Sequence, residues 1–268
     1  MSFKKNDFIS IITVCFNDLN GLINTVDSVM NFSRNYKGQV FYFIIDGGSS
    51  DGTKEYLESM SNFDTPSNID VSCISEKDSG IYDAMNKGVK LLPDDGHVLF
   101  LNSSDTFLEN ASEILNENPL NSDVIVYRVK SSTSMGQEIS VREMKSIDNI
   151  KCWPCFPHQS TFISNLIMKK HYYDTNFSIL ADYDFFCKCY INEYSIQIHN
   201  DYLSDFKQGG VSNNSKFILK YIDELTTIQT RYFGKYSVRI ILSTLIKALL
   251  RSNRLFARFE LILRKNIF

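Results

Sequence analysis

The chain has 268 residues, of which 43% are hydrophobic, 22% charged and 13% aromatic, with only 5 prolines. This composition is typical of one folded globular domain and excludes collagen-like, mucin-like and wholly disordered chains. The net charge of -3 is unevenly distributed, because residues 231–268 contain 9 Lys+Arg and 1 Asp+Glu, whereas residues 1–230 contain 19 and 30. This asymmetry indicates that the C-terminal segment meets an anionic surface.

Short apolar runs and helical patterns alternate through the first 105 residues. The predicted strands are 8–16, 39–45, 70–75 and 97–101. The intervening helices include one after Asn20-Gly21, a short one at 55–60 and one that begins near Ile81 and ends before Pro93. Strands that alternate with helices at this spacing predict an α/β fold with a doubly wound, mainly parallel sheet.

The alternation weakens after residue 105. We expect strands at 124–129 and 195–199 and helices within 177–190 and over 216–233, whereas residues 131–160 show no clear period. The predicted organisation is a βα half over 1–105, a second half of the same domain over 106–230 and a basic amphipathic helical tail over 231–268.

The sequence predicts neither a secretory leader nor a membrane span. Residues 1–7 are polar, and the apolar run that follows continues into a strand without a small-residue cleavage site. The longest apolar stretch, 240–250, is short and contains Lys247. We therefore expect a cytoplasmic protein.

Six cysteines are expected to be reduced thiols in that compartment. An alternative is a redox or zinc site built from Cys152-Trp-Pro-Cys155 with His158, Cys187 and Cys189. A redox motif usually has a strand-then-helix setting, which is absent, and known zinc-site spacings are not matched. Ordinary buried thiols are the favoured interpretation.

Four polar segments each follow a predicted strand: 16–17, 46–53, 76–80 and 102–105. Because ligands of open α/β sheets bind outside the carboxyl ends of the strands, we expect these segments to share one site. The glycine-rich dinucleotide and P-loop motifs are absent. Carboxylates in place of a cationic loop favour a phosphate ligand bridged by a hard divalent cation, and a nucleoside diphosphate fits this requirement.

Six motifs in sequence order resemble glycosyltransferase family 2 of the GT-A fold, in particular bacterial enzymes of surface polysaccharide and O-antigen biosynthesis. They are SIITVCFN (10–17), DGGSSDGT (46–53), SEKDSGIYDAMNKG (75–88), LNSSD (101–105), PHQ (157–159) and ADYD (181–184). The resemblance spans about residues 8–190. It implies a GT-A-type single domain and an inverting transfer of a hexose from a UDP-sugar to a saccharide linked to a polyprenyl diphosphate.

The resemblance also assigns residues to the donor. The implied donor-binding residues are Thr13, Phe16, Asn17, Asp46, Asp78, Ser103 and Ser104. Phe16 would pack near the uracil, Asp46 would accept a hydrogen bond from its N3–H, and Asp78 would help to close the pocket. A fixed carboxylate selects a base with an N–H donor, because a buried unpaired partner costs about 1–3 kcal/mol.

The LNSSD motif occupies the place of the family's metal-binding Asp-x-Asp. Ser103 stands at the position of the first acid, so that the implied metal ligand is Asp105. With one carboxylate, Mn²⁺ or Mg²⁺ would be held mainly by the diphosphate and water, and its affinity should be weak.

The ADYD motif supplies the expected catalytic base, Asp182, with Asp184 as the competing candidate. A base that accepts the proton of the attacking hydroxyl contributes about 10²–10⁴-fold to the rate. At positions i and i+2 of a helix the two acids face different ways, and we expect one of them to be structural. The resemblance places His158, Gln159 and Asp184 on the acceptor side.

The tail interleaves apolar residues with Arg and Lys, which is typical of an interfacial amphipathic helix. We expect it to bind the inner face of the cell membrane, with a helix packed on the domain as the alternative. Nucleic-acid binding is not expected, because RNA-binding motifs are absent. Two rival functions remain open: a sugar-nucleotide nucleotidyltransferase and a catalytically inactive sugar- or lipid-binding module.

Overall fold

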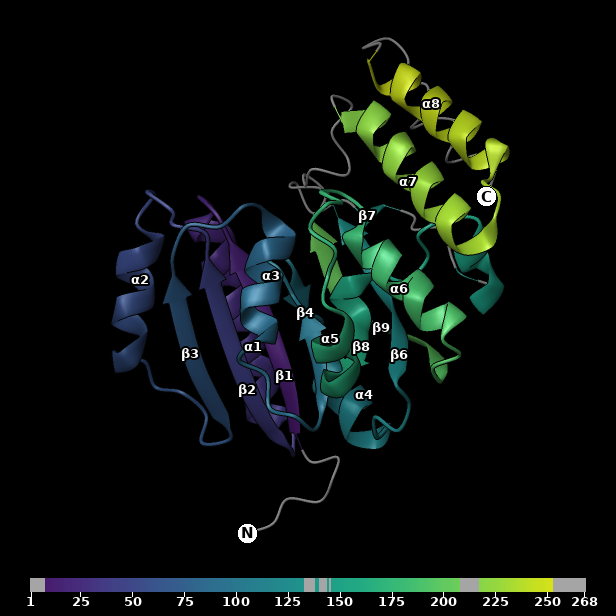
Figure 1. The fold of residues 1–268 in the computed structure, drawn as a ribbon. Helices are drawn as coiled ribbons and strands as arrows, with labels where there is room; N and C mark the ends of the chain where they lie inside the picture. The colour runs from purple at the N-terminus through teal and green to yellow at the C-terminus, as the bar shows by residue number, and fades with distance from the viewer. Residues whose placement is uncertain (1–7, 133–137, 140–143, 145, 208–216, 253–268) are drawn as a thin grey trace.

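The computed structural model describes residues 8–132, 138–139, 144, 146–207 and 217–252 (Figure 1). Its centre is a sheet in the order β3-β2-β1-β4-β8-β6-β9-β5, with β7 paired to β6. The parallel half contains β1 (Phe8–Cys15), β2 (Gln39–Asp46), β3 (Ile69–Ser75) and β4 (His97–Phe100). The mixed half contains β5 (Thr106–Phe107), β6 (Val124–Ser132), β7 (Glu138–Ile139), β8 (Thr161–Ser164) and β9 (Ile196–Lys207). The predicted α/β, mainly parallel fold is confirmed.

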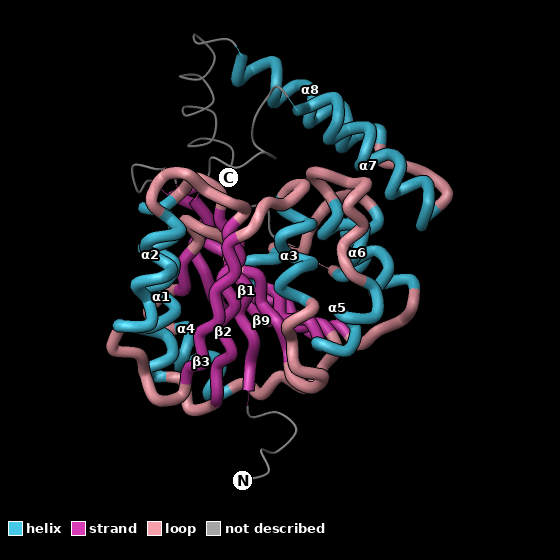
Figure 2. Tube along the Cα trace, turned by 60° about the vertical axis from the view of Figure 1, so that its left-hand side comes forward, coloured by secondary structure: helices cyan, strands magenta, loops and turns pink. Residues whose placement is uncertain are grey.

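Helices cover both faces of the sheet (Figure 2). One face carries α1 (Leu19–Asn35), α2 (Thr53–Ser59) and α4 (Ala111–Glu117), and the other carries α3 (Ile81–Val89), α5 (Asn165–His171) and α6 (Ala181–Ile191). Ile9 and Ile11 of β1 pack into the core on the α1 side, whereas Ile12 and Val14 pack into the core on the α3 side. Burial on both faces explains why β1 is a nearly continuous apolar run.

The strand register brings the polar segments to one edge. Cys15 at the end of β1 pairs with Asp46 of β2, and Asp46 pairs with Ser75 of β3. The loop after β4 joins the same edge, because the Ser103 N–H donates to the Val14 carbonyl at 3.1 Å. This edge contains the candidate site.

Several short elements were not predicted. These are β5, β7, β8, α4 and α5, together with the 3-10 turns η1 (Met60–Asn62), η2 (Ile147–Lys151) and η3 (His158–Ser160). Elements of two to seven residues are too short for a hydrophobic period to appear. The strand predicted at 195–199 extends to Lys207, because β9 stays paired with β6 across two register shifts.

The C-terminal helices α7 (Ile218–Phe233) and α8 (Val238–Ser252) form a hairpin beside α6 (Figure 1). Gly234 ends α7 in the left-handed conformation, with φ of +68°. Residues 253–268 of the predicted tail lie outside the described residues. Within the described part, no helix combines the length and the apolar composition needed to cross a bilayer.

Candidate active site

The loop after β1 is held against the loop after β2. Asn17 has a left-handed backbone with φ of 49°, and its N–H donates to Ser49 Oγ at 2.7 Å. Its side-chain carbonyl accepts from the Ser50 N–H at 2.9 Å. The preceding Phe16 remains 64% exposed. The Asn17 bonds therefore present an aromatic ring to solvent at the carboxyl edge of the sheet.

Two residues predicted to contact the donor lie in the interior. Asp46 is fully buried and accepts hydrogen bonds from the Ser49 N–H and hydroxyl and, at 2.6 Å, from the Ser75 hydroxyl. Thr13 is also fully buried, and its hydroxyl donates to the Leu101 carbonyl at 2.7 Å. Both side chains hold strand ends together, and this placement does not favour direct donor contact by either one.

Asp78 lies beside Gly47, the residue that follows Asp46. A Cβ atom built on Gly47 would lie only 2.4 Å from Asp78 Oδ2 and 3.3 Å from Phe16 Cδ2. The Gly80 N–H fixes the other Asp78 oxygen at 2.8 Å. We call Phe16, Gly47 and Asp78 the rim cluster. The Asp78 carboxylate and the Phe16 ring both lie next to Gly47, and the absence of a side chain on Gly47 leaves space beside them.

The LNSSD loop is fixed to the start of α1. The Ser104 hydroxyl donates to Asp18 Oδ2 at 2.9 Å, and Asp18 caps α1 by accepting from the Gly21 N–H at 3.2 Å. Ser104 adopts φ of 74°, a left-handed conformation that turns the chain into Asp105. Ser103 is partly exposed at the edge, whereas the Ser104 hydroxyl is engaged within the protein.

Asp105 is the implied metal ligand and is only 4% exposed. Burial raises its pKa to about 7, although its interactions with His158, the Lys207 backbone and the Gln159 side chain lower it. Within the described residues, no group of three or more His, Cys, Asp or Glu side chains is placed to hold a metal ion. Asp105 therefore has no set of protein side chains around it, within the described residues, that would form an all-protein cage for a metal.

Asp182 lies in the first turn of α6, with its side chain 18% exposed. One carboxylate oxygen accepts from the Tyr183 N–H at 2.8 Å and lies 3.1 Å from the Tyr82 hydroxyl. The other oxygen lies 3.1 Å from His158 Nδ1. Three elements, α6, α3 and η3, therefore fix the orientation of this carboxylate.

His158 connects Asp182 to the LNSSD loop. Its Nε2 lies 3.1 Å from the Asn102 side-chain nitrogen. Because a carboxylate only accepts hydrogen bonds, His158 Nδ1 carries the proton towards Asp182, and Nε2 accepts from the Asn102 amide. Gln159 is buried and contacts Asp105. Asp182 and His158 are thus connected to the LNSSD loop, and Gln159, the residue after His158, contacts Asp105 in that loop.

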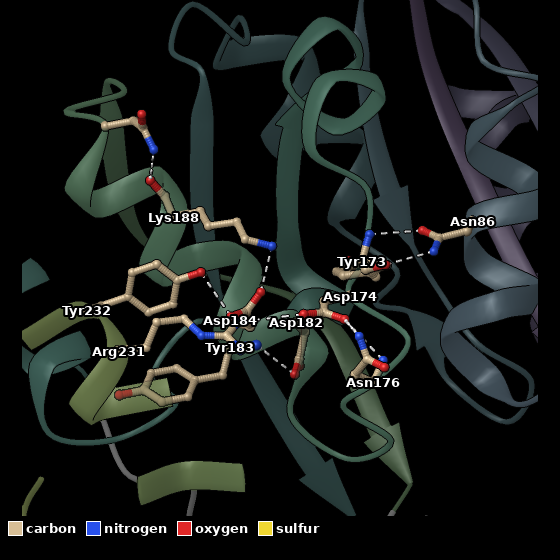
Figure 3. A network of polar contacts seen from close by, with 11 residues as sticks. Asn86, Tyr173, Asp174, Asn176, Asp182, Tyr183, Asp184, Lys188, Arg231 and Tyr232 are labelled. Atoms are coloured by element: carbon tan, nitrogen blue, oxygen red, sulfur yellow. Dashed lines mark hydrogen bonds and ion pairs between the residues drawn. The ribbon is translucent and has the colours of Figure 1, made fainter. Parts of the chain in front are cut away.

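Asp184 occupies a different environment (Figure 3). It is fully buried and contacts Lys188 at 2.7 Å, Arg231 at 3.0 Å and the Tyr232 hydroxyl at 2.9 Å. The prediction that the two acids of α6 face different ways is confirmed. Asp184 joins α6 to α7, and this position does not favour the acceptor role predicted for it.

Sequence reasoning missed Tyr82 and Asn102, although both lie inside the quoted motifs. Tyr82 is buried beneath Asp182, and burial raises its pKa well above the ordinary value, so that it remains a protonated donor. No sequence pattern separates it from a core aromatic residue. Only the fold reveals that its hydroxyl reaches Asp182.

The three-layer α/β domain has the GT-A fold. The family model "Glycosyl transferase family 2" matches residues 10–181, and the chain belongs to this family. An uncharacterized glycosyltransferase of Mycobacterium tuberculosis, Rv1514c, is 31% identical over 196 residues, which cover 66% of each chain. The minor teichoic acid biosynthesis protein GgaA of Bacillus subtilis is 34% identical over 103 residues, which cover 38% of this chain and 22% of GgaA.

Solved structures confirm the GT-A fold. TarS 1–349 of S. aureus in complex with UDP has a TM-score of 0.59 at 18% identity, and the match covers 84% of this chain and 64% of TarS. The mannosyltransferase PcManGT of Pyrobaculum calidifontis, in complex with GDP-Man and Mn²⁺, has a TM-score of 0.61 at 9% identity, covering 90% of this chain and 69% of that chain.

Proposed function

We propose that the chain is an inverting hexosyltransferase that moves a sugar from a UDP-sugar to a hydroxyl of a lipid-diphosphate-linked saccharide in surface polysaccharide assembly. The observation that carries the proposal is the contact chain from Asp182 through His158 to Asn102. It joins a partly exposed, oriented carboxylate to the loop that contains Asp105. This contact chain supports a proposed base next to a proposed diphosphate site, as a glycosyl transfer requires.

The rim cluster supports binding of a uracil base. Phe16 offers an exposed aromatic ring, and Asp78 offers a carboxylate beside it. Because the Asp46 oxygens already accept hydrogen bonds within the protein, Asp78 is the better acceptor for the uracil N3–H. Asp46 then shapes the loop that carries Gly47. The TarS complex with UDP supports the choice of donor nucleotide.

Asp78→Asn tests this assignment. The amide oxygen accepts more weakly than a carboxylate, and the amide NH₂ can donate to cytosine N3, so UDP affinity should fall about tenfold and the preference for UDP over CDP should narrow. Calorimetry with both nucleotides measures the effect. Asp70→Asn, an exposed acid on β3, is the matched control. An unchanged preference in Asp78→Asn would return the role of acceptor to Asp46.

A divalent cation, Mn²⁺ or Mg²⁺, would be held by Asp105 together with the donor diphosphate. Such an ion stabilises the negative charge that develops on the departing nucleotide. The single carboxylate of Asp105 suits a weakly bound ion that arrives with the donor. The PcManGT complex with Mn²⁺ supports a metal in this fold.

Asp182 acts as the general base. It accepts the proton of the acceptor hydroxyl as that oxygen attacks the anomeric carbon and the bond to UDP breaks, so that an α-linked donor yields a β-glycoside. Tyr82 and His158 keep the carboxylate in one orientation before the acceptor arrives. His158 and Gln159 line the same region and are the proposed acceptor contacts.

Release of UDP is the experiment that tests the function. The full chain is incubated with a panel of UDP-sugars and lipid-linked acceptors, with and without Mn²⁺. Release that depends on both the sugar nucleotide and the acceptor supports a transferase. Pyrophosphate release from UTP and a sugar phosphate would indicate the nucleotidyltransferase alternative, and UDP binding without any turnover would indicate an inactive binding module.

The α7–α8 hairpin supports docking on an anionic membrane at the cytoplasmic face. Val238, Leu242 and Ile246 recur at spacing i, i+4, i+8 on α8, and each is more than half exposed. An exposed apolar stripe of this kind, in a segment rich in Arg and Lys, is typical of an interfacial helix. Docking would place the site beside a lipid-linked acceptor.

Leu242→Ser/Ile246→Ser tests this docking. Removing two exposed apolar side chains should lower the partition coefficient onto anionic liposomes about 30-fold or more, because each contributes about 1–2 kcal/mol when it enters the interface. Turnover of a detergent-soluble acceptor should stay unchanged. Leu166→Ser, an equally exposed apolar residue on α5, is the control. Unchanged partitioning of the double variant would contradict membrane docking through α8.

A further inference from the structure

Three successive backbone N–H groups before α6 converge on one carboxylate from α7. Glu224 Oε1 accepts from the Ser178 N–H at 2.9 Å, and Oε2 accepts from the Ile179 N–H at 3.0 Å and the Leu180 N–H at 2.9 Å. The Ser178 hydroxyl adds a contact at 3.2 Å. Glu224 is only 4% exposed, so that these bonds lie in the protein interior.

The carboxylate binds the backbone segment that leads into α6, whose first helical residue is Ala181. Leu180 occupies the N-cap position and contributes no side-chain hydrogen bond. The first N–H groups of a helix lack intrahelical partners and carry partial positive charge, so a buried carboxylate at this end is favourable. Glu224 therefore holds residues 178–180 at the positively charged end of α6.

Asp182 lies two residues after Leu180, the last residue that Glu224 binds. The Ile179 carbonyl accepts from the Tyr82 hydroxyl at 2.8 Å, and the same hydroxyl lies 3.1 Å from Asp182. The segment is thus held from α7 through its N–H groups and from α3 through a carbonyl. A shift of the segment would move Asp182 relative to both Tyr82 and His158.

We propose that Glu224 is a positioning residue for the general base Asp182, through which the C-terminal hairpin sets the catalytic geometry. This inference rests on the proposed function. Glu224 acts on the backbone that carries the base, and neither the donor nor the acceptor contacts it. Its loss should therefore lower kcat and leave donor binding intact.

Glu224→Gln is the principal variant, because it keeps the shape of the side chain and replaces one accepting oxygen with a donor that faces N–H groups. The kcat of transfer should fall about tenfold or more, while the KM for the donor and the Kd of UDP stay within twofold. Asp223→Asn, the exposed neighbouring acid on α7, makes the same change in charge and should leave kcat unchanged.

Combination with Asp182→Asn separates positioning from general destabilisation. If Glu224 acts through Asp182, then Glu224→Gln should not lower the residual rate of Asp182→Asn any further. A kcat of Glu224→Gln equal to that of the wild type, or a loss that persists in the Asp182→Asn background, overturns the inference. If Glu224→Gln fails to fold, the same comparison is made with Glu224→Asp, with the same criteria.

If the wild-type chain releases no UDP from any donor, that result counts against the proposed function alone. Amide hydrogen exchange then still tests the positioning role of Glu224. The variant is Glu224→Gln, or Glu224→Asp if only that one folds. Amide exchange at Ile179 and Leu180 should accelerate at least tenfold, because these N–H groups lose their bonds to Glu224. Exchange at Tyr183 should accelerate by the same factor, because its N–H bonds to Asp182, which the segment carries. Unchanged exchange at Tyr183 would show that Glu224 does not control the base, and would overturn the inference.

Discussion

Asp182→Asn should lower the rate of sugar transfer by about 10²–10⁴-fold and leave UDP affinity unchanged. The amide loses the basicity needed to accept the acceptor proton. It can still accept hydrogen bonds from the Tyr183 N–H and the Tyr82 hydroxyl, so the first turn of α6 should keep its structure. Steady-state kinetics and calorimetric UDP binding on the same preparation measure the two effects.

Asp201→Asn is a suitable control for this variant, because Asp201 is an exposed acid on β9. It should retain the wild-type rate. Turnover by Asp182→Asn within a few-fold of the wild type would contradict the assignment of the base. A parallel loss of UDP affinity would indicate that Asp182 serves the donor instead.

Asp184→Asn should chiefly destabilise the fold. Breaking a fully buried ion pair costs about 3–5 kcal/mol, but Lys188 and Arg231 reach solvent, so we expect about 2–3 kcal/mol here. For a domain of this size the midpoint of thermal unfolding should fall by about 5–10 °C. Differential scanning calorimetry measures the shift, and kcat at low temperature should change little.

The same variant separates the two roles that have been considered for Asp184. If its melting temperature is unchanged while the KM for the acceptor rises, Asp184 contacts the acceptor, as the ADYD motif first suggested. Lower stability with an unchanged KM for the acceptor supports the contacts with Lys188, Arg231 and Tyr232 as its function.

The parallel half of the sheet could be predicted because its central strands are buried on both faces. The runs at β1, β2 and β4 are therefore almost uninterrupted apolar segments. The mixed half gave a weaker pattern, because β5 and β8 have two and four residues and obtain their stability from neighbours distant in sequence. The pairing of β4 with β8 joins the two halves. It is a contact between residues far apart in the sequence, which the spacing of apolar residues within one segment does not predict.

The motifs supplied the residues of the candidate site but not the direction in which each side chain faces. Asp46 and Asp78 both follow predicted strands. Only the structure shows that the Asp46 carboxylate already accepts hydrogen bonds from Ser49 and Ser75. Glu224 lies 42 residues beyond Asp182, on a helix with no motif. Its hydrogen bonds to the segment before α6 are a tertiary contact that sequence spacing does not reveal.

A crystal structure of the full chain with an intact UDP-sugar and Mn²⁺ tests the central claim most directly. The account predicts that uracil packs against Phe16 and donates its N3–H to Asp78, and that the diphosphate lies beside Asp105. It also predicts that an acceptor hydroxyl fits between the anomeric carbon and the Asp182 carboxylate. A nucleotide bound away from the rim cluster, or an anomeric carbon that faces away from Asp182, would contradict it.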